Sequence, residues 1–367
     1  MKICYITTGL DQYKGGGEVL LNIINALKSR HQVTVYTAET NVKNPDFDLR
    51  VLAVREWPYY YGLFDYFFAR RVFAALQSSS EKFDIIHVNQ VVGAPTAKLA
   101  KLGTPIIYEI HHPATADLGA ALDFEKNPWQ RFIWRVRYYP IIRAQKMLAK
   151  KFPILTVSHA SAEKISADYG VAQKNISVIY NAVDTGIFKP SAPKEPNTVI
   201  AVGSFIHPRK GFDYLLKIYE DLNSRGVKIL DVGRRPAYGL KKLAALKNVT
   251  RFGTVGREEL INLYSRAMVH ISPSRYEGFG LSILEAMACG TPTVAFAVGG
   301  AKEVLEMVDP ALLTAPSDVD EMLKKIYAIL NNPEPRKVDL WRQKIEEKFG
   351  ISKITNELEI FYQKTQG

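Results

Sequence analysis

The chain has little cysteine and no long apolar run, and both shortages exclude classes of protein. Two cysteines among 367 residues cannot form the disulfide framework of a small secreted protein. Cys4 and Cys289 lie among small or apolar residues, so we expect buried, reduced thiols. No uninterrupted run of about 18 apolar residues is present to span a membrane, and the apolar run at 1–10 is too short for a signal peptide. The sequence predicts a cytoplasmic protein, or a peripheral one on the cytoplasmic face of a membrane.

Acidic residues are also scarce relative to basic ones. The chain has 37 Asp and Glu against 48 Lys and Arg, a formal charge of +11. This surplus favours an anionic partner, which could be nucleic acid, a phosphorylated substrate or an anionic membrane surface. Hydrophobic residues (47%) and charged residues (23%) occur in the proportions of a folded protein, which excludes a disordered chain. The length predicts about two domains.

Short β-rich runs alternate with helical patterns in both halves of the chain. In the first half we expect a helix at 17–30 and strands at 2–8, 32–38, 83–90, 104–112, 153–160 and 175–183. A proline-rich segment at 187–198 reads as a linker. After it we expect helices at 211–226 and 282–290 and strands at 198–205, 227–233, 249–255, 267–274 and 292–300.

This alternation predicts an α/β protein with doubly wound parallel sheets. We expect two Rossmann-like domains that face each other across a cleft. The first domain is expected at 1–188 and the second at 189–348. A C-terminal helix at 349–367 is expected to pack back on the first domain.

Ligands bind open α/β sheets beyond the carboxyl ends of the strands, and the first half offers two candidates there. Gly15, Gly16 and Gly17 stand between a strand and a helix, where the backbone can approach an anion; the alternative is an ordinary tight turn. His111 ends a strand, and its imidazole can bond sugar hydroxyls or phosphate oxygens, unless it is structural. His112 is the less favoured of the two.

The strongest pattern is SPSRYEGFGLSILEAMACG at 272–290. Glu277 lies in a loop, Gly280 lets the backbone approach a ligand, and a helix begins near Leu281, with Glu285 one turn inside it. This layout offers amides for a diphosphate and two carboxylates for sugar and ribose hydroxyls. The alternative makes Glu285 a routine surface residue.

Arg209 and Lys210 lie in a second loop of this half, between a strand and a helix. There they can neutralise a phosphate, or they form a solvated basic loop.

These segments resemble the GT-B fold glycosyltransferases of the large retaining family 4, also called glycosyl transferases group 1. Glu277 and Glu285, with seven residues between them, match the family's two glutamates, and 276–295 follows the surrounding motif. The segments at 181–190 and 249–267 also resemble family segments, although Ala182 stands where glycine is usual. The resemblance covers nearly the whole chain and is most specific in the second half.

The resemblance implies that 1–188 is the acceptor-side domain and 189–348 the nucleotide-sugar-binding domain. It also implies a role for each candidate residue. It implies catalytic roles for His111, Glu277 and Lys210, of which the first two contact the donor sugar and the last the diphosphate. It places at the donor site Gly16, Ser204, Arg209, Phe279, Gly280, Leu281 and Glu285, with Glu285 on the ribose. The family acts without a bound metal, because cationic side chains and helix amides stabilise the departing diphosphate. We therefore expect no cofactor, and a UDP- or GDP-linked sugar as substrate.

Two features depart from the simplest form of this prediction. Ser204 occupies the position of an arginine usual in the family, and serine cannot neutralise a diphosphate; Arg209, Arg234 or Arg275 could supply the charge. The triplets DFD at 46–48 and DVD at 318–320 spell a metal-binding motif of other glycosyltransferases. We expect both in loops away from the cleft and treat them as accidental.

The segments 55–73 and 129–152 mix aromatic residues with Arg and Lys. The favoured interpretation is a pair of core-facing helices with solvated cationic sides. The next is a surface that docks on anionic lipid, and nucleic acid is the least favoured partner because no nucleic-acid motif accompanies the charge.

The predicted function is a hexosyltransferase that moves a sugar from a nucleoside-diphosphate sugar to a hydroxyl acceptor. It retains the anomeric configuration, needs no metal, and acts on a lipid-linked or cell-envelope glycan. The alternatives are a catalytically silent nucleotide-sugar-binding subunit and a sugar epimerase of the same fold, and the motif at 276–295 argues against the epimerase.

Overall fold

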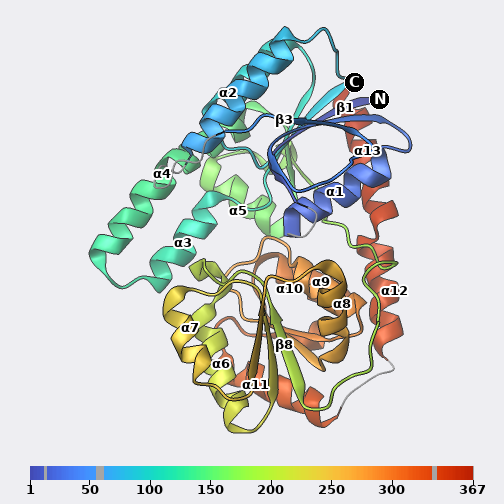
Figure 1. The fold of residues 1–367 in the computed structure, drawn as a ribbon. Helices are drawn as coiled ribbons and strands as arrows, with labels where there is room; N and C mark the ends of the chain where they lie inside the picture. Colours follow the sequence, from blue (N-terminus) through green and yellow to red (C-terminus); the bar gives the residue numbers. More distant parts are fainter. Residues whose placement is uncertain (12–14, 55–61, 333–336, 367) are drawn as a thin grey trace. The chain divides into compact units, whose positions relative to one another are not determined.

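The computed structural model describes residues 1–11, 15–54, 62–332 and 337–366, and the chain divides into two compact units (Figure 1). The N-terminal unit consists of Met1–Ala182 and Ile351–Gly367, and the C-terminal unit of Val183–Gly350. Each unit contains one parallel β-sheet with helices on its two faces. The predicted α/β class with two Rossmann-like sheets is therefore confirmed.

The sheet of the N-terminal unit has seven strands in the order β3-β2-β1-β4-β5-β6-β7. Their bounds are β1 (Lys2–Leu10), β2 (Gln32–Thr40), β3 (Asp48–Val51), β4 (Ile85–Asn89), β5 (Ile106–Glu109), β6 (Ile154–Thr156) and β7 (Ile176–Val178). The order changes direction at β1 and β4, which pair in parallel. At such a switch point the loops at the carboxyl ends of neighbouring strands leave room for a ligand.

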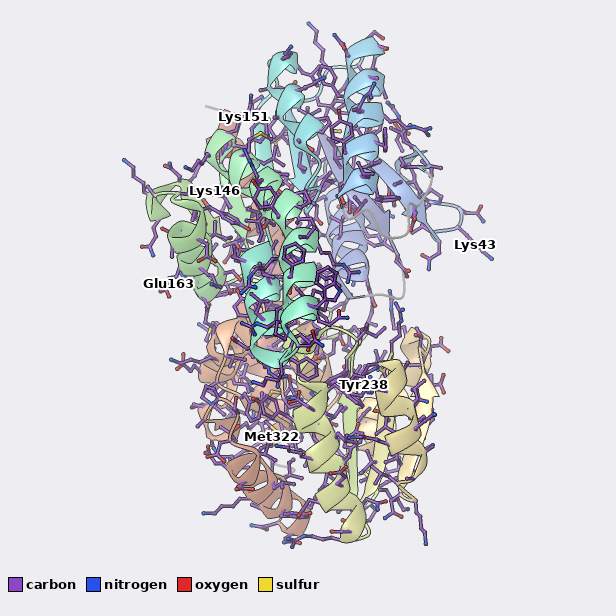
Figure 2. The ribbon with its side chains drawn as sticks, turned by 90° about the vertical axis from the view of Figure 1, so that its left-hand side faces the viewer. Lys43, Lys146, Lys151, Glu163, Tyr238 and Met322 are labelled. Atoms are coloured by element: carbon purple, nitrogen blue, oxygen red, sulfur yellow. The ribbon has the colours of Figure 1, made fainter. Side chains whose placement is uncertain are left out.

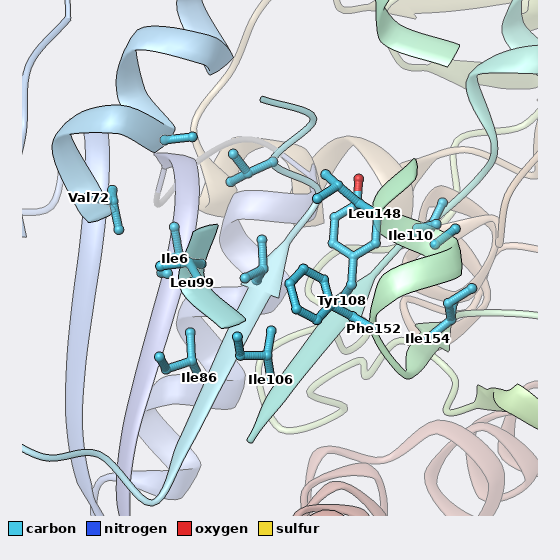
Figure 3. Close-up of a cluster of buried hydrophobic side chains, with 14 of the residues drawn as sticks. Ile6, Val72, Ile86, Leu99, Ile106, Tyr108, Ile110, Leu148, Phe152 and Ile154 are labelled. Atoms are coloured by element: carbon cyan, nitrogen blue, oxygen red, sulfur yellow. The ribbon is translucent and has the colours of Figure 1, made fainter. Parts of the chain in front are cut away.

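Helices cover both faces of this sheet. They are α1 (Gly15–Leu27), α2 (Leu63–Ser78), α3 (Ala114–Phe124), α4 (Pro128–Lys151), α5 (His159–Tyr169) and α13 (Ile351–Gln366), with short 3₁₀ turns at Ala94–Leu102 and Gln173–Asn175. On one face α2, α4 and α5 pack on the strands through Val72, Leu148 and Tyr108 among others (Figure 3). On the other face α1 and α13 close the core through Ile24 and Leu358.

The sheet of the C-terminal unit has six strands in the order β10-β9-β8-β11-β12-β13. Their bounds are β8 (Thr198–Val202), β9 (Lys228–Val232), β10 (Val249–Gly253), β11 (Val269–Ser272), β12 (Thr293–Phe296) and β13 (Leu313–Thr314). The helices are α6 (Phe212–Ser224), α7 (Ala237–Ala244), α8 (Arg257–Arg266), α9 (Leu281–Ala288), α10 (Gly299–Val308), α11 (Val319–Asn331) and α12 (Lys337–Phe349), with 3₁₀ turns at Pro208–Lys210 and Pro310–Leu312. The strands β8, β11 and β12 are buried almost throughout because helices cover both faces of the sheet, whereas Thr250 and Arg251 of the edge strand β10 are exposed.

Several predicted elements were too long or misplaced. The strand predicted at 153–160 ends at Thr156, and α5 begins at His159 because the Ser158 side chain accepts the Ser161 amide and caps the helix. The loop prediction for DFD holds for Asp46 and Phe47, which lie outside any helix or strand, but Asp48 starts β3. The loop prediction for DVD was wrong, because Asp318 caps α11 and the other two residues begin that helix. Among the described residues, no group of three or more His, Cys, Asp or Glu could hold a metal ion.

Both cysteines are buried and unpaired with each other, as predicted, and burial raises the pKa of the Cys289 thiol to about 12. The core interpretation of 129–152 was wrong for most of α4. Only Gln145, Leu148 and Ala149 of this helix are buried, whereas Trp129 is 66% exposed. Part of the segment 55–73 lies outside the described residues, and the remainder forms the start of α2. Across the described parts of the chain, no helix is long and apolar enough to cross a bilayer.

Candidate functional site

The loop between β11 and α9 in the C-terminal unit carries the strongest sequence motif. Gly280 precedes α9 with a φ of 108°, and no side chain caps the helix. A residue with a side chain would be strained at this φ, and its Cβ would lie 2.9 Å from Ile283 Cδ1. The first amides of a helix have no partner within it. Phe279, Gly280 and Leu281 therefore bring backbone amides and the positive end of a helix dipole to the carboxyl end of the sheet.

The start of α10 holds this loop in place. The Gly300 amide donates to the Glu277 carbonyl at 2.8 Å. A Cβ on Gly299 would lie 2.2 Å from that carbonyl oxygen, and one on Gly300 would lie 2.4 Å from the Gly278 carbonyl oxygen. Only glycine allows this approach, so the two glycines fix the backbone of the motif.

Glu277 lies at the centre of a charged cluster. Lys210 Nζ donates to Glu277 Oε2 at 2.5 Å, and the Ser274 hydroxyl donates to the same oxygen at 3.3 Å. Arg209 Nη1 lies 3.8 Å from the other carboxylate oxygen. The structure thus brings together Arg209, Lys210 and Glu277, which sequence analysis placed on two separate loops. The two cations balance the carboxylate and leave net positive charge for an anionic ligand.

Lys210 is positioned by its own turn. It ends the 3₁₀ turn Pro208–Lys210, and Gly211 follows with a φ of 70°. A Cβ on Gly211 would lie 2.0 Å from the Pro273 carbonyl oxygen, and the Arg275 amide donates to the Arg209 carbonyl at 2.7 Å. The Lys210 turn and the Glu277 loop therefore pack directly on each other.

Glu285 lies one turn into α9, where the Tyr264 hydroxyl of α8 donates to its carboxylate at 3.1 Å. Tyr264 is fully buried, and Glu285 is half-buried. Glu285 is therefore not a routine surface residue, because a buried partner orients its carboxylate.

The structure distinguishes the three arginines that could replace the charge missing at Ser204. Arg275 is held by two hydrogen bonds to Asp213, at 2.7 and 2.5 Å, and Arg209 pairs with Glu277. Arg234 is exposed, and its carbonyl accepts the Phe205 amide at 2.9 Å. Arg234 therefore follows β9 directly beside Ser204, which is exposed after β8.

A buried ion pair that the sequence did not predict joins β9 to the loop that follows it. Arg235 and Asp231 have fully buried side chains, and Arg235 Nη2 lies 2.5 Å from Asp231 Oδ1. Arg235 also donates to the Gly203 carbonyl at 2.7 Å, which fixes the end of β8. The sequence does carry a signal for this pair: Asp231 is the one acidic residue in strand β9, and Arg235 follows it four residues later.

In the N-terminal unit, α1 begins in the predicted glycine run and includes Gly16. A Cβ on Gly17 would lie 2.8 Å from the Asp11 backbone nitrogen, so glycine is required there. A pocket at the carboxyl ends of β1, β2 and β4 is lined by Gly17, Asp11, Glu39 and Gln90 among others. The glycine run therefore borders a polar pocket.

His111 follows β5, and both of its ring nitrogens have partners. Its Nε2 lies 3.0 Å from Glu109 Oε1, and its Nδ1 lies 2.9 Å from Gln90 Nε2. Gln90 has a φ of 58°, in the left-handed region that side chains rarely adopt. His112 instead contacts Asp117 at 3.1 Å. Sequence analysis found His111 but not Glu109 or Gln90, which reach it from the ends of β5 and β4.

Comparison with known proteins identifies the family. A family model described as glycosyl transferases group 1 matches residues 196–332, and one described as glycosyltransferase family 4 matches residues 13–186. The MMP α-(1→4)-mannosyltransferase of Mycolicibacterium hassiacum is 32% identical over 310 residues, which are 81% of this chain and 74% of that protein. The chain belongs to glycosyltransferase family 4, as the motifs predicted.

Solved structures agree on the fold. WaaG, a glycosyltransferase involved in lipopolysaccharide biosynthesis, matches with a TM-score of 0.75 at 18% identity, over 98% of this chain and 99% of that one. HepE of Anabaena, solved with UDP and glucose, matches with a TM-score of 0.74 at 19% identity, over 99% of both chains. The fold is GT-B. The protein is a hexosyltransferase of family 4 that transfers a sugar from a nucleotide-sugar donor.

Proposed function

We propose that the protein transfers a hexose, with retention of configuration, from a UDP- or GDP-linked donor to a hydroxyl of a lipid-linked or cell-envelope glycan. The observation that carries the proposal is the cluster of Glu277 and Lys210 beside the start of α9, with Glu285 one turn inside that helix. The likeness to HepE with UDP and glucose, and to WaaG of lipopolysaccharide biosynthesis, supports the donor and acceptor classes.

Each part of the donor has a matching group in the C-terminal unit. Glu285 accepts hydrogen bonds from the ribose hydroxyls. The diphosphate is held by Lys210 and by the amides of Phe279, Gly280 and Leu281, and Arg234 supplies the charge that Ser204 lacks. Glu277 binds the donor sugar. In the N-terminal unit, the His111 imidazole binds sugar hydroxyls. Gly16 serves the phosphate or acceptor side.

The proposed reaction breaks the bond from the sugar anomeric carbon to the diphosphate oxygen and forms a bond from that carbon to the acceptor oxygen. Both events occur on one face of the sugar, and the departing phosphate oxygen takes the acceptor's proton. The developing charge on the diphosphate is stabilised by the cations and amides already in place. We therefore expect activity to persist in EDTA, and a loss of activity restored by Mg²⁺ or Mn²⁺ would contradict this step.

A panel of UDP- and GDP-linked hexoses tests the proposal, with release of nucleoside diphosphate and nucleotide-sugar affinity measured side by side. The proposal predicts slow hydrolysis of one donor without acceptor. Tight binding of a donor with no hydrolysis, and no transfer to lipid-linked or envelope-glycan acceptors, would favour the silent binding subunit. The contact between Glu277 and Lys210 supports the transferase over that alternative.

We further propose that the protein works at the cytoplasmic face of an anionic membrane, with α4 as the contact. This helix carries seven Lys and Arg and no acid, and Lys146 and Lys151 are among them (Figure 2). Apolar residues at helical spacing are exposed along it: Trp129 (66%), Phe132 (53%), Val136 (56%) and Tyr139 (60%). Aromatic groups flanked by cations match the interface of an anionic bilayer.

Vesicle flotation tests this contact. The parent should float with vesicles of anionic lipid at low salt and be released at high salt, because salt screens exposed charges. Changing the exposed Arg135, Arg143 and Lys146 to glutamate should abolish flotation. Arg131 is left unchanged because its guanidinium bonds the Glu125 carbonyl within the protein.

The matched control changes three exposed lysines of the C-terminal unit, Lys217, Lys228 and Lys241, to glutamate. Equal loss of flotation in the control would assign binding to net charge rather than to α4. Parent protein that does not float at low salt would contradict the proposal.

A further inference from the structure

A buried hydrogen-bond network lies beneath His111 in the N-terminal unit, and Glu109 is its centre. Glu109 Oε1 lies 3.0 Å from His111 Nε2, and Asn89 Nδ2 donates to Glu109 Oε2 at 2.5 Å. His87 Nε2 lies 2.9 Å from the same oxygen. Burial would raise the pKa of Glu109, but the adjacent His111 and His87 hold it well below its usual range. Glu109 is therefore an ionised carboxylate at neutral pH.

An ionised carboxylate can only accept hydrogen bonds, so it determines where its neighbours carry their protons. His111 must hold a proton on Nε2, and in the neutral ring its Nδ1 is then an acceptor. The Gln90 amide donates to that nitrogen at 2.9 Å, in agreement with this tautomer. A carboxylate thus orients the ring from one side, and the opposite nitrogen is left to accept a hydrogen bond.

The network continues to the last helix of the chain. Tyr362 of α13 contacts His87 Nδ1 through its hydroxyl at 2.6 Å, and the Tyr5 hydroxyl lies 2.5 Å from the Tyr362 hydroxyl. Burial raises the pKa of both phenols, so both stay protonated and can donate. The hydrogen bonds can run in one direction from Tyr5 through Tyr362 to His87 Nδ1, and the other ring nitrogen of His87 lies at ion-pair distance from Glu109. All members lie in the N-terminal unit, so the network needs no contribution from the other unit.

We propose that Glu109 is a positioning residue that fixes His111 as the Nε2–H tautomer and presents its Nδ1 as an acceptor for a hydroxyl of a bound sugar. The hydroxyl replaces the Gln90 amide, which occupies this nitrogen in the structure. The proposal rests on the sugar-binding role proposed above for His111. It adds the direction of that contact: the sugar donates and His111 accepts.

The tautomer can be measured without activity, by imidazole ¹⁵N NMR of the full chain. His111→Gln assigns the His111 signals among the seven histidines. The parent should show a proton on Nε2 and a lone pair on Nδ1. Glu109→Gln should shift His111 toward a mixture of tautomers, because an amide cannot accept from all three neighbours. Glu109→Asp keeps a carboxylate and should restore most of the parent signature.

A matched control is the second glutamate–histidine contact of this unit. Glu359 Oε1 lies 2.7 Å from His31 Nε2, away from the carboxyl ends of the strands. Glu359→Gln should leave the His111 signals unchanged. A parent His111 with its proton on Nδ1 would overturn the proposal, as would identical His111 signals in the parent and Glu109→Gln.

Kinetics then separate positioning from a structural role. Glu109→Gln should lower kcat about 100-fold through misplacement of the ring, while nucleoside diphosphate affinity in the C-terminal unit stays unchanged. In a His111→Ala background the same change should have almost no further effect, because Glu109 acts only through His111. Additive losses would overturn the proposal.

The role of His111 in sugar transfer can be refuted without refuting the proposal that Glu109 fixes its tautomer. If no donor turns over, or if His111→Ala turns over like the parent, the role of His111 in transfer is refuted. The tautomer measurement still decides whether Glu109 fixes the ring.

Discussion

Gly300→Ala should disable the donor loop without touching any charged residue. A Cβ at this position would lie 2.4 Å from the Gly278 carbonyl oxygen and 2.5 Å from Phe279 Cα, whereas an ordinary contact begins at 3.4 Å. Both neighbours are backbone, so the loop that carries Glu277 must retreat by about 1 Å. A displacement of about 1 Å in a catalytic group lowers turnover about 100-fold.

The assay compares donor turnover and nucleoside diphosphate affinity in the parent and Gly300→Ala. Both should fall, because the loop supplies diphosphate amides as well as Glu277. Alanine is otherwise preferred to glycine inside a helix by about 0.5–1 kcal/mol, so a loss of helix propensity cannot explain the effect. Gly256→Ala is the control: it precedes α8 in the same unit, and its Cβ would meet nothing within 4 Å. A folded Gly300→Ala protein with parental turnover and affinity would refute this account of the loop.

Three further predictions concern the C-terminal unit. Glu285→Ala should weaken nucleotide-sugar binding by roughly 1.5–3 kcal/mol in isothermal titration, because the ribose loses a charged acceptor; unchanged affinity in a folded variant removes Glu285 from the site. Arg234→Ala should weaken nucleoside diphosphate binding about tenfold and Lys228→Ala should not, and equal affinities would leave the charge missing at Ser204 unexplained. Burial and the nearby Lys210 lower the pKa of His270 to about 3 from 6.5, so between pH 6 and 4 only the unfolded chain takes up this proton. The free energy of unfolding should fall with decreasing pH by about 1.4 kcal/mol per unit more in the parent than in His270→Asn, and equal slopes in urea titrations would contradict the shift.

Local patterns predicted the elements that bury one continuous apolar face. Strands such as β1 and β9 are short apolar runs between polar turns, and they were found within a few residues. The motif around Glu277 was found because glycine, acid and helix start are all adjacent in sequence. The ends of helices and strands were predicted less accurately, as at Ser158, because a single capping hydrogen bond can decide where a helix begins.

The rest of the candidate site depends on contacts between distant segments. Lys210 and Glu277 are 67 residues apart and meet only because β8 and β11 are neighbours in the sheet. Glu109 looked like an ordinary strand residue, since neither spacing nor composition places His87 and Tyr362 beside it. Sequence patterns report periodicity along one element, and such polar networks arise from several elements at once.

The exposed stripe on α4 was misjudged for a related reason. Aromatic residues at helical spacing usually face a core, and sequence alone does not show which side of a helix the protein covers. In the structure the buried residues of α4 are Gln145, Leu148 and Ala149. Trp129 and Tyr139 of the same helix are exposed.

Glu277→Gln is the most direct test of the donor site itself. The change keeps the size of the side chain but removes the charge that Lys210 contacts at 2.5 Å. If Glu277 binds the sugar and the nucleotide is held elsewhere, turnover of the donor should fall at least about 100-fold, while nucleoside diphosphate affinity measured by titration stays near the parent value. Parental turnover, or an equal loss of turnover and nucleotide affinity, would contradict the assignment of this cluster as the sugar-transfer site.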